Sequence, residues 1–502
     1  MITTRHQRTV IEAPVREAIV ARHYDGTTPD PEAGTVPRLV ALTTHLYAPD
    51  AVDDETGRPF VCARTLASLE DRLAQFHSKN YKGEDLLREY RDRVDPTFEW
   101  SPYRMRNKCR TATQFDCDPD LVLLARAPRT SDPAVLVYAA DGTPVTSDSR
   151  AGDLDEARAG AFARSGCHFD HRVPIVLDYL NSLPSNRYTS AVNLYHQRAV
   201  ARAEKLLASD EITGVQHSVA LASMAALVAQ PTPVYALSRR ERSQRLFPVN
   251  QGLLTLSSTL SKEYRADWAT YDLVSSQSAI NAVDWGADKV TSFLERHIGT
   301  PGALWAHLAA AVGKDIAEVK GPIKEAFYSL QFGKDIDAIV VGLDGSVGAG
   351  AGEAFTDDRL VRDFAEARNR WYRQIKGARG LEGAFGEWIP LGRGRDAASL
   401  AAERSQGVEF LLLYPAVELA MSTDRWDIVL WQHDGFDVAF RDKSRWLQTG
   451  RQICAAVDDE CRRRGYPTRL VLDRSPDGGD TDRHARVPYK ARSQRLGRGC
   501  RV

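Results

Sequence analysis

Apolar residues recur at helical spacing in two long stretches of the first half of the chain. Leucine and aromatic residues repeat about every 3.6 positions between residues 65 and 93, and residues 188–230 are rich in alanine and leucine. Both patterns predict helices. Residues 122–146 instead predict strands joined by turns. The first 55 residues are rich in proline and threonine and show only weak periodicity.

The second half of the chain alternates short apolar runs with helical patterns, which predicts an α+β fold with a mixed sheet that carries helices. Residues 447–464 predict a helix, and residues 467–472 predict a strand. The segment 342–352 reads GLDGSVGAGAG and follows the apolar run 338–341. Because it lacks the Gly-Lys-Ser/Thr ending of a phosphate-binding loop, we interpret it as a flexible glycine-rich loop.

Composition limits the class of protein. A chain of 502 residues suits two to four subdomains, and 43% apolar with 26% charged residues is typical of a soluble globular protein. The longest apolar stretch, residues 218–230, is too short to span a bilayer, and no apolar signal region opens the chain. Seven scattered cysteines favour reduced thiols and a cytoplasmic location. With a net charge of −1, any attraction of a polyanion would have to be local.

Two aspartates are candidates for metal-dependent chemistry. A short strand ending at Asp272 would place its carboxylate at the mouth of a cleft, with Ser275 and Ser276 capping the next helix. Asp434-Gly435 joins two apolar runs, which predicts a hairpin whose turn exposes Asp434 at the sheet edge. Phosphoryl transfer to a 3′-hydroxyl needs two divalent ions about 3.5–4 Å apart, held by carboxylates. Taken alone, each aspartate is better explained as an ordinary loop or turn residue.

A third segment repeats a basic or aromatic residue at every fourth position. These residues would share one helix face, with Gly333 as a C-cap: Lys320, Lys324, Tyr328 and Phe332. Two cations beside two rings suit a nucleoside triphosphate, although an amphipathic helix with solvent-reaching lysines would show the same pattern. Pro322 predicts that the helix starts or kinks near that residue, with Lys320 at its N-terminal edge.

In this order, the three segments resemble motifs A, B and C of family A, DNA polymerase I-like, polymerases, and their spacings are also close to that family's. The resemblance covers roughly residues 235–475. It implies a right-hand polymerase fold with a mixed palm sheet, helical fingers and a helical thumb. It also implies two Mg²⁺ ions held by Asp272 and Asp434, a triphosphate contact from Lys324, and stacking of Tyr328 on the incoming nucleotide.

The remaining motif positions match the family less closely. Lys320 takes the place of the usual arginine on the phosphates, and Phe332 replaces the usual tyrosine near the templating base. His433 matches the motif C histidine, which is followed here by Asp434-Gly435 rather than by Asp-Glu. The family's glutamate that blocks a ribose 2′-hydroxyl is replaced by Gln277. These departures bear on sugar selectivity more than on the chemistry.

The register of motif A leaves an alternative open for the sugar gate. A two-residue insertion after Asp272 would move Ala279 into the gate position in place of Gln277. An open gate at Ala279 would admit ribonucleotides easily, whereas Gln277 would keep a weakened preference for deoxynucleotides.

Two basic segments are candidates for DNA contacts. Arginines cluster where the family carries a primer-template-binding segment, at Arg239, Arg240, Arg242 and Arg245. The last segment, residues 483–502, holds seven basic and no acidic residues, which suits a solvated tail, a nonspecific phosphate contact, or both. A Cys/His-rich segment at 167–171, with Cys109 and Cys117 upstream, fits no zinc spacing well, so we favour packed or solvated residues there.

The resemblance suggests a domain plan. It comprises an N-terminal accessory and thumb-like region (1–225), a first palm part (226–290), fingers (291–405), a second palm part (406–475) and a basic tail (476–502). No convincing Asp-x-Glu exonuclease motif is present, so we predict no proofreading. The expected function is DNA-directed DNA synthesis, with primer-template DNA and dNTPs as partners and no membrane association.

Two other functions stay open on the sequence. A single-subunit RNA polymerase or primase is favoured by the His-Asp-Gly-Phe sequence at 433–436 and by the missing motif A glutamate. The short spacing from motif A to motif B argues against it. A polymerase-derived nucleic-acid-binding protein without chemistry is the other alternative, and the retained Asp272, Asp434, Lys324 and Tyr328 argue against that one.

Overall fold

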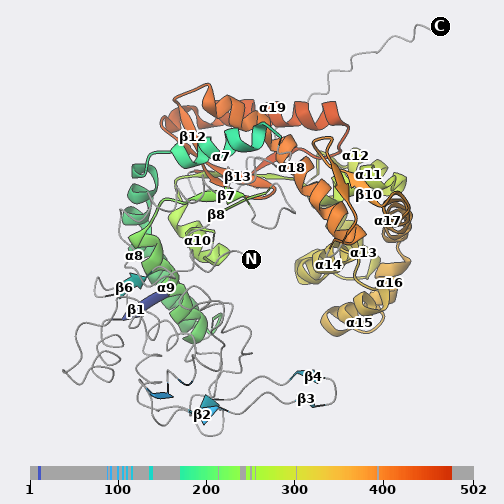
Figure 1. The fold of residues 1–502 in the computed structure, drawn as a ribbon, viewed down its shortest axis with the longest axis horizontal. Coiled ribbons are helices and arrows are strands. Elements are labelled where there is room, and N and C mark those ends of the chain that lie inside the picture. Colours follow the sequence, from blue (N-terminus) through green and yellow to red (C-terminus); the bar gives the residue numbers. More distant parts are fainter. Residues whose placement is uncertain are drawn as a thin grey trace. The chain divides into compact units, whose positions relative to one another are not determined.

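The structure is a computed structural model that describes residues 170–476 except 213, 238–244, 249–251, 255, 301 and 393–394 (Figure 1). Before residue 170 it describes residues 88 and 91–92 and six short strands: β1 (Thr9–Glu12), β2 (Glu99–Trp100), β3 (Met105–Arg106), β4 (Cys109–Arg110), β5 (Phe115–Asp116) and β6 (Val135–Tyr138). The helix prediction for residues 65–93 therefore lies mostly outside the described residues. The described residues form a helix-rich α+β fold with small antiparallel sheets, which confirms the predicted α+β class. The right-hand arrangement of palm, fingers and thumb stays a prediction.

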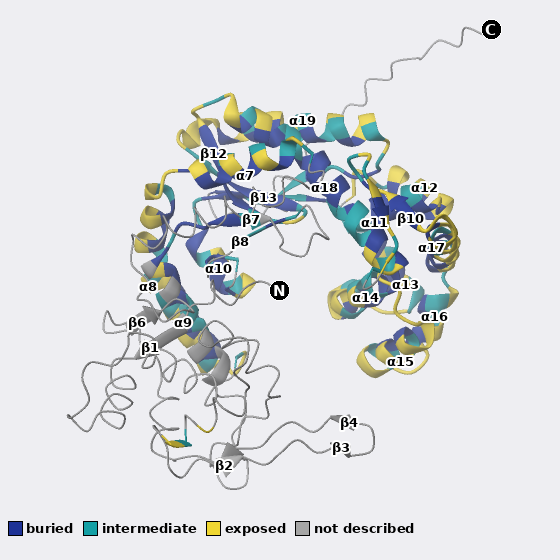
Figure 2. Cartoon of the chain, in the orientation of Figure 1, coloured by how far each residue is buried: buried dark blue, intermediate teal, exposed yellow. Residues whose placement is uncertain are grey.

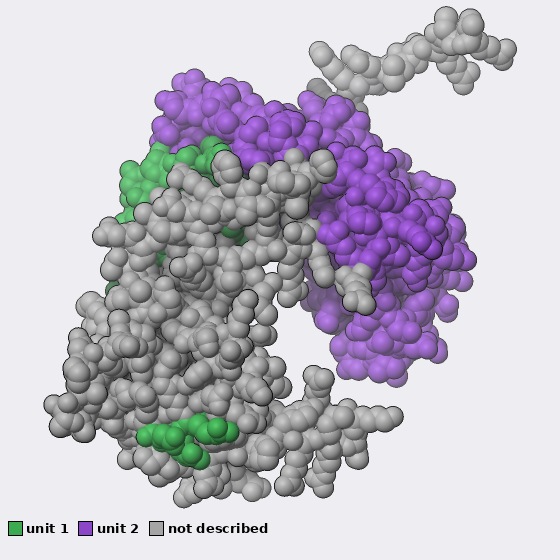
Figure 3. Space-filling view, viewed as in Figure 1, with its two compact units in different colours: residues 1–169, 177–241, 246–266 green, residues 170–176, 242–245, 267–502 purple. Residues whose placement is uncertain are grey.

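The chain divides into two compact units (Figure 3). The first comprises residues 1–169, 177–241 and 246–266, and the second comprises 170–176, 242–245 and 267–502. This division does not test the predicted domain boundaries, which stay a prediction. No helix among the described residues is long and apolar enough to cross a membrane.

The described part of the first unit is mainly helical. Helices α8 (Asn186–Ala208) and α9 (Gly214–Ala229) pack against each other and confirm the helical prediction for residues 188–230. Helix α10 (Ser258–Tyr264) packs on α8, and β7 (Tyr235–Leu237) pairs with β8 (Leu246–Pro248). Helix α7 (Arg172–Ser182) contributes residues to both units.

The second unit is built on a four-stranded sheet of order β12-β13-β9-β14. Its strands are β9 (Ala269–Leu273), β12 (Trp426–Trp431), β13 (Gly435–Phe440) and β14 (Leu470–Arg474). The predicted hairpin at Asp434-Gly435 and the predicted strand at Asp272 are confirmed. The prediction of a mixed sheet is wrong, because all three strand pairings are antiparallel. A tight hairpin joins β12 to β13. Strands β13 and β14 come from later parts of the chain, and each pairs with β9 in the antiparallel direction.

Two long helices pack beside this sheet. Helix α18 (Ala397–Met421) contacts β12 and also packs against α19 (Trp446–Arg464), which contacts β14. Helix α19 confirms the helix predicted at 447–464, whereas the strand predicted at 467–472 begins at Leu470. A short 3-10 helix, η3 (Lys443–Arg445), precedes α19. Every residue of β12 is buried (Figure 2), whereas β14 at the other edge of the sheet is only partly buried.

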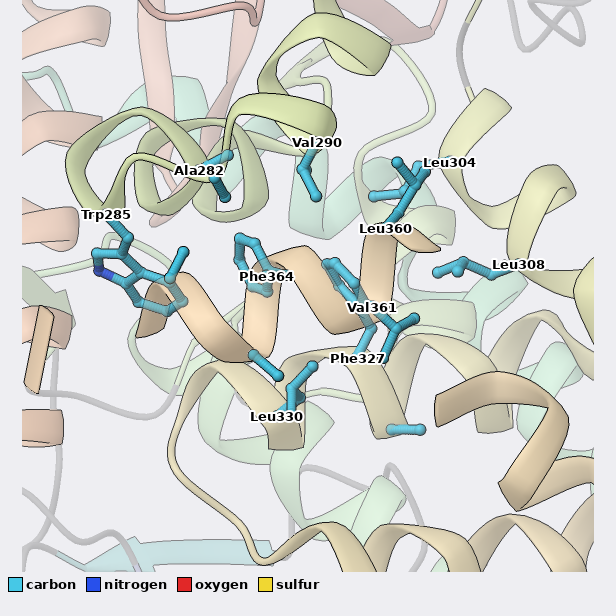
Figure 4. Packing of buried hydrophobic residues seen from close by; sticks show 14 of the residues in the cluster. Ala282, Trp285, Val290, Leu304, Leu308, Phe327, Leu330, Leu360, Val361 and Phe364 are labelled. Atoms are coloured by element: carbon cyan, nitrogen blue, oxygen red, sulfur yellow. The ribbon is translucent and has the colours of Figure 1, made fainter. Parts of the chain in front are cut away.

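The rest of the second unit is a helical layer with its own apolar core. It contains α11 (Ser276–Trp285), α12 (Asp288–Arg296), α13 (Ala303–Ala311), α14 (Ile316–Gln331), α15 (Ile336–Val347), α16 (Ala351–Asp357), α17 (Arg359–Ala378) and the hairpin β10 (Gly380–Glu382) with β11 (Trp388–Pro390). Figure 4 shows Phe364 between Trp285 and Phe327 at the centre of this core. The ring centroid of Phe364 lies 4.8 Å from that of Trp285 and 4.9 Å from that of Phe327.

Two sequence predictions about this layer are wrong. Most of the expected glycine-rich loop at 342–352 belongs to α15 and α16, which pack closely together. A Cβ atom on Gly352 would collide with the Val340 backbone, so this glycine permits close helix packing rather than loop flexibility. The predicted start of α14 near Pro322 is wrong as well, whereas the predicted alternative of a kink at that residue stays a prediction. Helix α14 begins at Ile316, where the Asp315 carboxylate accepts a hydrogen bond from the Ala317 amide.

Candidate active site

Asp272 and Asp434 meet at one end of the β9–β13 pairing. Asp272 lies opposite Gly435 in the strand register, and the Leu273 amide donates a hydrogen bond to the Asp434 carbonyl oxygen at 2.8 Å. A Cβ atom at position 435 would collide with the Tyr271 carbonyl oxygen. Glycine therefore lets the turn close against β9 and brings together two aspartates from distant parts of the sequence.

The electrostatics of Asp272 reflect this meeting of like charges. Burial raises the pKa of the Asp272 carboxyl well above its ordinary value, and the negative charges of Asp434 and Asp473 raise it further. Lys324 opposes these effects and lowers the pKa, so its ammonium group lies close enough to act on Asp272. Several carboxyl groups therefore lie close together here, and the Lys324 ammonium is near enough to offset part of the cost of ionising them.

Helix α14 brings Lys324 and Tyr328 to the same site. The Lys324 Nζ atom lies 5.5 Å from the Trp305 ring centroid and 5.8 Å from the Tyr328 ring centroid. Burial, followed by the charges of Asp434 and Asp272, raises the pKa of Tyr328 to about 12. The buried face of α14 packs into the helical core, which leaves Lys324 and Tyr328 half-buried beside the carboxylates.

The other predicted nucleotide-binding residues lie on α14, on α11 and in the turn between β12 and β13. Lys320 is exposed one turn before Lys324, and Phe332 is 48% exposed at the C-cap of α14, followed by Gly333 in a left-handed conformation as expected. Gln277 is half-buried in the first turn of α11, whereas Ala279 is completely buried in the helical core.

His433 is exposed in the turn between β12 and β13. Partial desolvation, and then the positive charge of Arg245, lower the pKa of its imidazole. His433 therefore lies close to Arg245 and is neutral at neutral pH.

A buried ionic network next to this site was not predicted from the sequence. The Arg245 guanidinium donates to Glu409 Oε2 at 2.7 Å, and the Ser276 hydroxyl donates to Glu409 Oε1 at 2.8 Å. Glu409 is 0% exposed. Burial raises the pKa of Glu409 to about 7, against the opposing effect of Arg245. A glutamate within the apolar run 408–413 was the available sequence signal, since a buried charge requires a partner.

Ser276 also corrects the predicted capping of α11. Ser275 occupies the N-cap position, but its backbone is left-handed, with φ of 51°, and its side chain makes no capping hydrogen bond. The tight turn from β9 into α11 imposes this conformation. It leaves the Ser276 hydroxyl directed at Glu409 instead of at the helix backbone.

Several predicted residues lie outside the described part of the chain. These are Arg239, Arg240, Arg242, the tail 483–502 and the Cys167–Phe169 part of the Cys/His segment. Of the predicted DNA-binding arginines, Arg245 is described, and it is engaged by Glu409. Among the residues that the structure does describe, no group of three or more His, Cys, Asp or Glu side chains is arranged to hold a metal ion.

No protein-family model matches the chain, and no curated protein matches it. Among solved structures, the chain is similar to the POL domain of Pol1 from M. smegmatis in complex with DNA primer-template and dNTP. The TM-score is 0.40 and the sequence identity 13%, over 66% of this chain and 66% of that chain, just under two thirds of each. Similarity at this level does not establish a family, so the geometry of the site has to carry the functional conclusion.

Proposed function

We propose that this chain is a DNA-directed DNA polymerase that adds deoxynucleotides to a primer 3′-hydroxyl. The observation that carries the proposal is the meeting of Asp272 on β9 with Asp434 in the turn before β13, with Lys324 and Tyr328 of α14 beside them. A carboxylate pair facing a cation and a ring has the groups needed to bind metal ions, phosphates and a base. The order of these residues along the chain supports a family A enzyme, and the lack of a convincing Asp-x-Glu exonuclease motif supports one without proofreading.

Two magnesium ions fit the chemistry of this site. Asp272 and Asp434 present hard oxygen donors, and burial together with mutual repulsion makes their negative charge costly without a cation. When bound, such ions would activate the primer hydroxyl and stabilise charge on the transferring phosphate. The aspartates would hold the ions, and the protein would thereby orient the two reactants.

The residues of α14 would select and position the nucleotide. Lys324 would pair with the triphosphate, because its ammonium group already lies near the carboxylates that would hold the metal ions. Lys320, one turn away and exposed, would extend the contact along the phosphates. Tyr328 would stack on the incoming base, and Phe332 would lie toward the templating base. His433 would contact the nucleotide from the hairpin turn.

The primer-template would be bound by basic residues of several segments. Arg239, Arg240, Arg242 and Arg245 would contact the duplex, and the tail 483–502 would add nonspecific phosphate contacts. The proposed palm comprises residues 226–290 and 406–475, the fingers 291–405, and an accessory and thumb-like region 1–225. We infer that the enzyme works in the cytoplasm on primed DNA.

A single-subunit RNA polymerase or primase is the second candidate function. It is favoured by the neutral gate residue, since the Gln277 amide can donate to or accept from a ribose 2′-hydroxyl. The alternative register with an open gate at Ala279 is not supported, because Ala279 is packed inside the helical core. A half-buried Gln277 supports a real but weakened preference for deoxynucleotides.

Primer extension with four dNTPs and, in parallel, four NTPs separates these functions. The wild-type protein should extend a primed DNA template faster with dNTPs, and Asp272→Asn should not extend it. Asp267→Asn is the matched control. Asp267 lies just before the same strand, but its carboxylate pairs with Lys443 and is not part of the Asp272–Asp434 site. Faster extension with NTPs would favour the RNA polymerase reading. Template binding without extension by any nucleotide would favour an inactive binding protein.

A further inference from the structure

Helix α17 carries a stripe of positive charge on its solvent side. Five exposed cations recur along it: Arg359, Arg362, Arg370, Arg373 and Lys376. At 3.6 residues per turn, they fall within about a third of the helix circumference and extend along about 25 Å of its length. The opposite side is buried in the helical core, so α17 presents this stripe outward (Figure 2). The stripe contrasts with a chain whose net charge is −1.

The cations of the stripe lack the acidic partners that surface arginines have elsewhere in the same unit. On α19, Arg462 pairs with Asp459, and both Arg463 and Arg464 pair with Glu460. Within the described ranges, by contrast, no ion pair involves any of the five stripe cations. The α19 arginines are therefore paired with carboxylates of their own helix, whereas the positive charge of the α17 stripe can attract an anionic ligand.

The hydrogen bonds that the stripe arginines do make go to backbone carbonyl oxygens, which do not neutralise their positive charge. Arg370 donates to the Gly286 carbonyl oxygen, and Arg373 donates to a carbonyl oxygen one turn earlier. Of the two acidic residues on α17, Asp363 accepts hydrogen bonds from two backbone amides of α12, and Glu366 lies exposed within the stripe. The pKa of Asp396 is lowered mainly by its hydrogen bonds from Ser399. Lys376 lies near enough to add a smaller lowering effect.

An exposed tryptophan lies at the C-terminal end of the stripe. Trp388 of β11 is 57% exposed and lies opposite Glu382 of β10, a strand that begins two residues after the end of α17. A Cβ atom on Gly380 would collide with the Trp388 ring, so the ring lies against the backbone that leaves α17. An indole held in this way offers a fixed stacking surface next to the cations.

We propose that the α17 stripe and Trp388 form a binding surface for single-stranded nucleic acid. Successive phosphates would lie along the cations, and one unpaired base would stack on the indole. A duplex would offer the phosphates but no free base face, and this favours a single strand. The inner side of α17 instead contacts α14, because Arg368 donates to the Leu330 carbonyl oxygen and Tyr372 to that of Gln331. The surface is thus separate from Lys324 and the two aspartates.

The proposal rests on the proposed function only in taking nucleic acid as the ligand, so binding can be tested without nucleotide transfer. The probe is a fluorescent 20-nucleotide oligothymidylate, titrated by anisotropy at several salt concentrations. Changing Arg359, Arg362, Arg370 and Arg373 together to alanine should make the log K versus log salt slope shallower by about 0.7 per lost contact. The same four changes to lysine should keep the wild-type slope.

Trp388→Ala tests the stacking part separately. It should weaken oligothymidylate binding by about 5- to 150-fold while leaving the binding of a duplex of equal length unchanged. The matched control replaces Arg462, Arg463 and Arg464 with alanine, which removes paired arginines and should leave the slope unchanged. Thermal unfolding midpoints close to wild type would show that each variant is folded.

Four outcomes would overturn all or part of this proposal. An unchanged salt slope in the four-alanine variant, or an equal change in the α19 control, would show that α17 does not contact the phosphates. Equal loss of single-strand and duplex binding in Trp388→Ala would remove the stacking role. If Asp272→Asn, which should lack nucleotide transfer, still binds with the wild-type slope and the stripe variant does not, the surface stands whatever the chemistry proves to be. A wild-type protein that binds no nucleic acid would refute both proposals.

Discussion

The sheet edge and the helical layer of the second unit bury very different side chains. Around Phe364, the layer buries aromatic and aliphatic groups in mutual contact. Beside the strand ends that bring Asp272 and Asp434 together, Glu409 of α18 is completely buried, and burial raises the pKa of both Asp272 and Glu409. Burying ionisable groups that repel one another costs stability, whereas apolar packing supplies it. This difference is what we expect if the strand ends bind ligands and the layer holds α14 in place beside them.

The largest expected effect comes from removing one aspartate from the edge. Asp434→Asn should lower the rate of single-nucleotide addition by more than about a thousandfold, because a metal ion contributes several kcal/mol to the barrier. The unfolding midpoint should not fall, since the substitution relieves repulsion with Asp272. Rapid-quench kinetics and a thermal melt measure the two quantities. A large loss of stability alongside the lost activity would mean that Asp434 is structural.

Phe364→Ala should show the opposite behaviour in the helical layer. Loss of a fully buried ring should destabilise the protein by about 3–5 kcal/mol, because a cavity would form between Trp285 and Phe327. Nucleotide addition should persist at low temperature, where the variant remains folded. Denaturant unfolding would measure the loss of stability, and nucleotide addition by the variant would be compared at about 10 °C and about 37 °C. Loss of activity in a fully folded Phe364→Ala protein would contradict the division of roles.

Glu409 gives the edge a pH-dependent stability. The pKa of Glu409 is raised from 4.5 to about 7 in the folded protein. The folded state therefore binds this proton more tightly than the unfolded chain does, and the stabilisation is fully present below pH 4.5. That contribution is lost as the pH rises from 4.5 through 7, and it amounts to about 3 kcal/mol. The stability of wild type minus that of Glu409→Gln should therefore fall across this window. A constant difference between pH 4.5 and pH 8 would show that Glu409 does not titrate there.

Gln277 should have the smallest effect. Gln277→Ala should relax the preference for dATP over ATP by about 2- to 10-fold, which corresponds to one hydrogen bond. Gln277→Glu should sharpen the same preference. Measurement of kcat/KM for both nucleotides in the three proteins tests this. An unchanged ratio in Gln277→Ala would show that the sugar is read elsewhere.

The parts of the site that sequence could predict are those set by local chemistry. Asp434-Gly435 between two apolar runs predicts a hairpin, and the strand containing Asp272 follows from a short apolar pattern. The four-residue repeat likewise predicts the helix that carries Lys324 and Tyr328. In each case the signal lies within about a dozen residues, and the structure contains the element at that place.

The parts that sequence did not predict depend on contacts between distant segments. Arg245 and Glu409 are 164 residues apart, and no local pattern connects them. Packing in the helical layer also overrides local preferences. Helix α14 extends through Pro322 because Val319 and Ile323 are buried on either side of it, and Gly352 belongs to a helix because another helix packs on it.

The central claim is that Asp272 and Asp434 together hold two metal ions for templated nucleotide addition. The most direct measurement is the binding of Mn²⁺, a spectroscopic substitute for Mg²⁺, followed by electron paramagnetic resonance. It would be made with primer-template DNA and a non-hydrolysable dNTP present. We predict two tightly bound ions per wild-type chain and a loss of tight binding in Asp272→Asn and in Asp434→Asn. Equal Mn²⁺ binding in all three proteins would contradict the account.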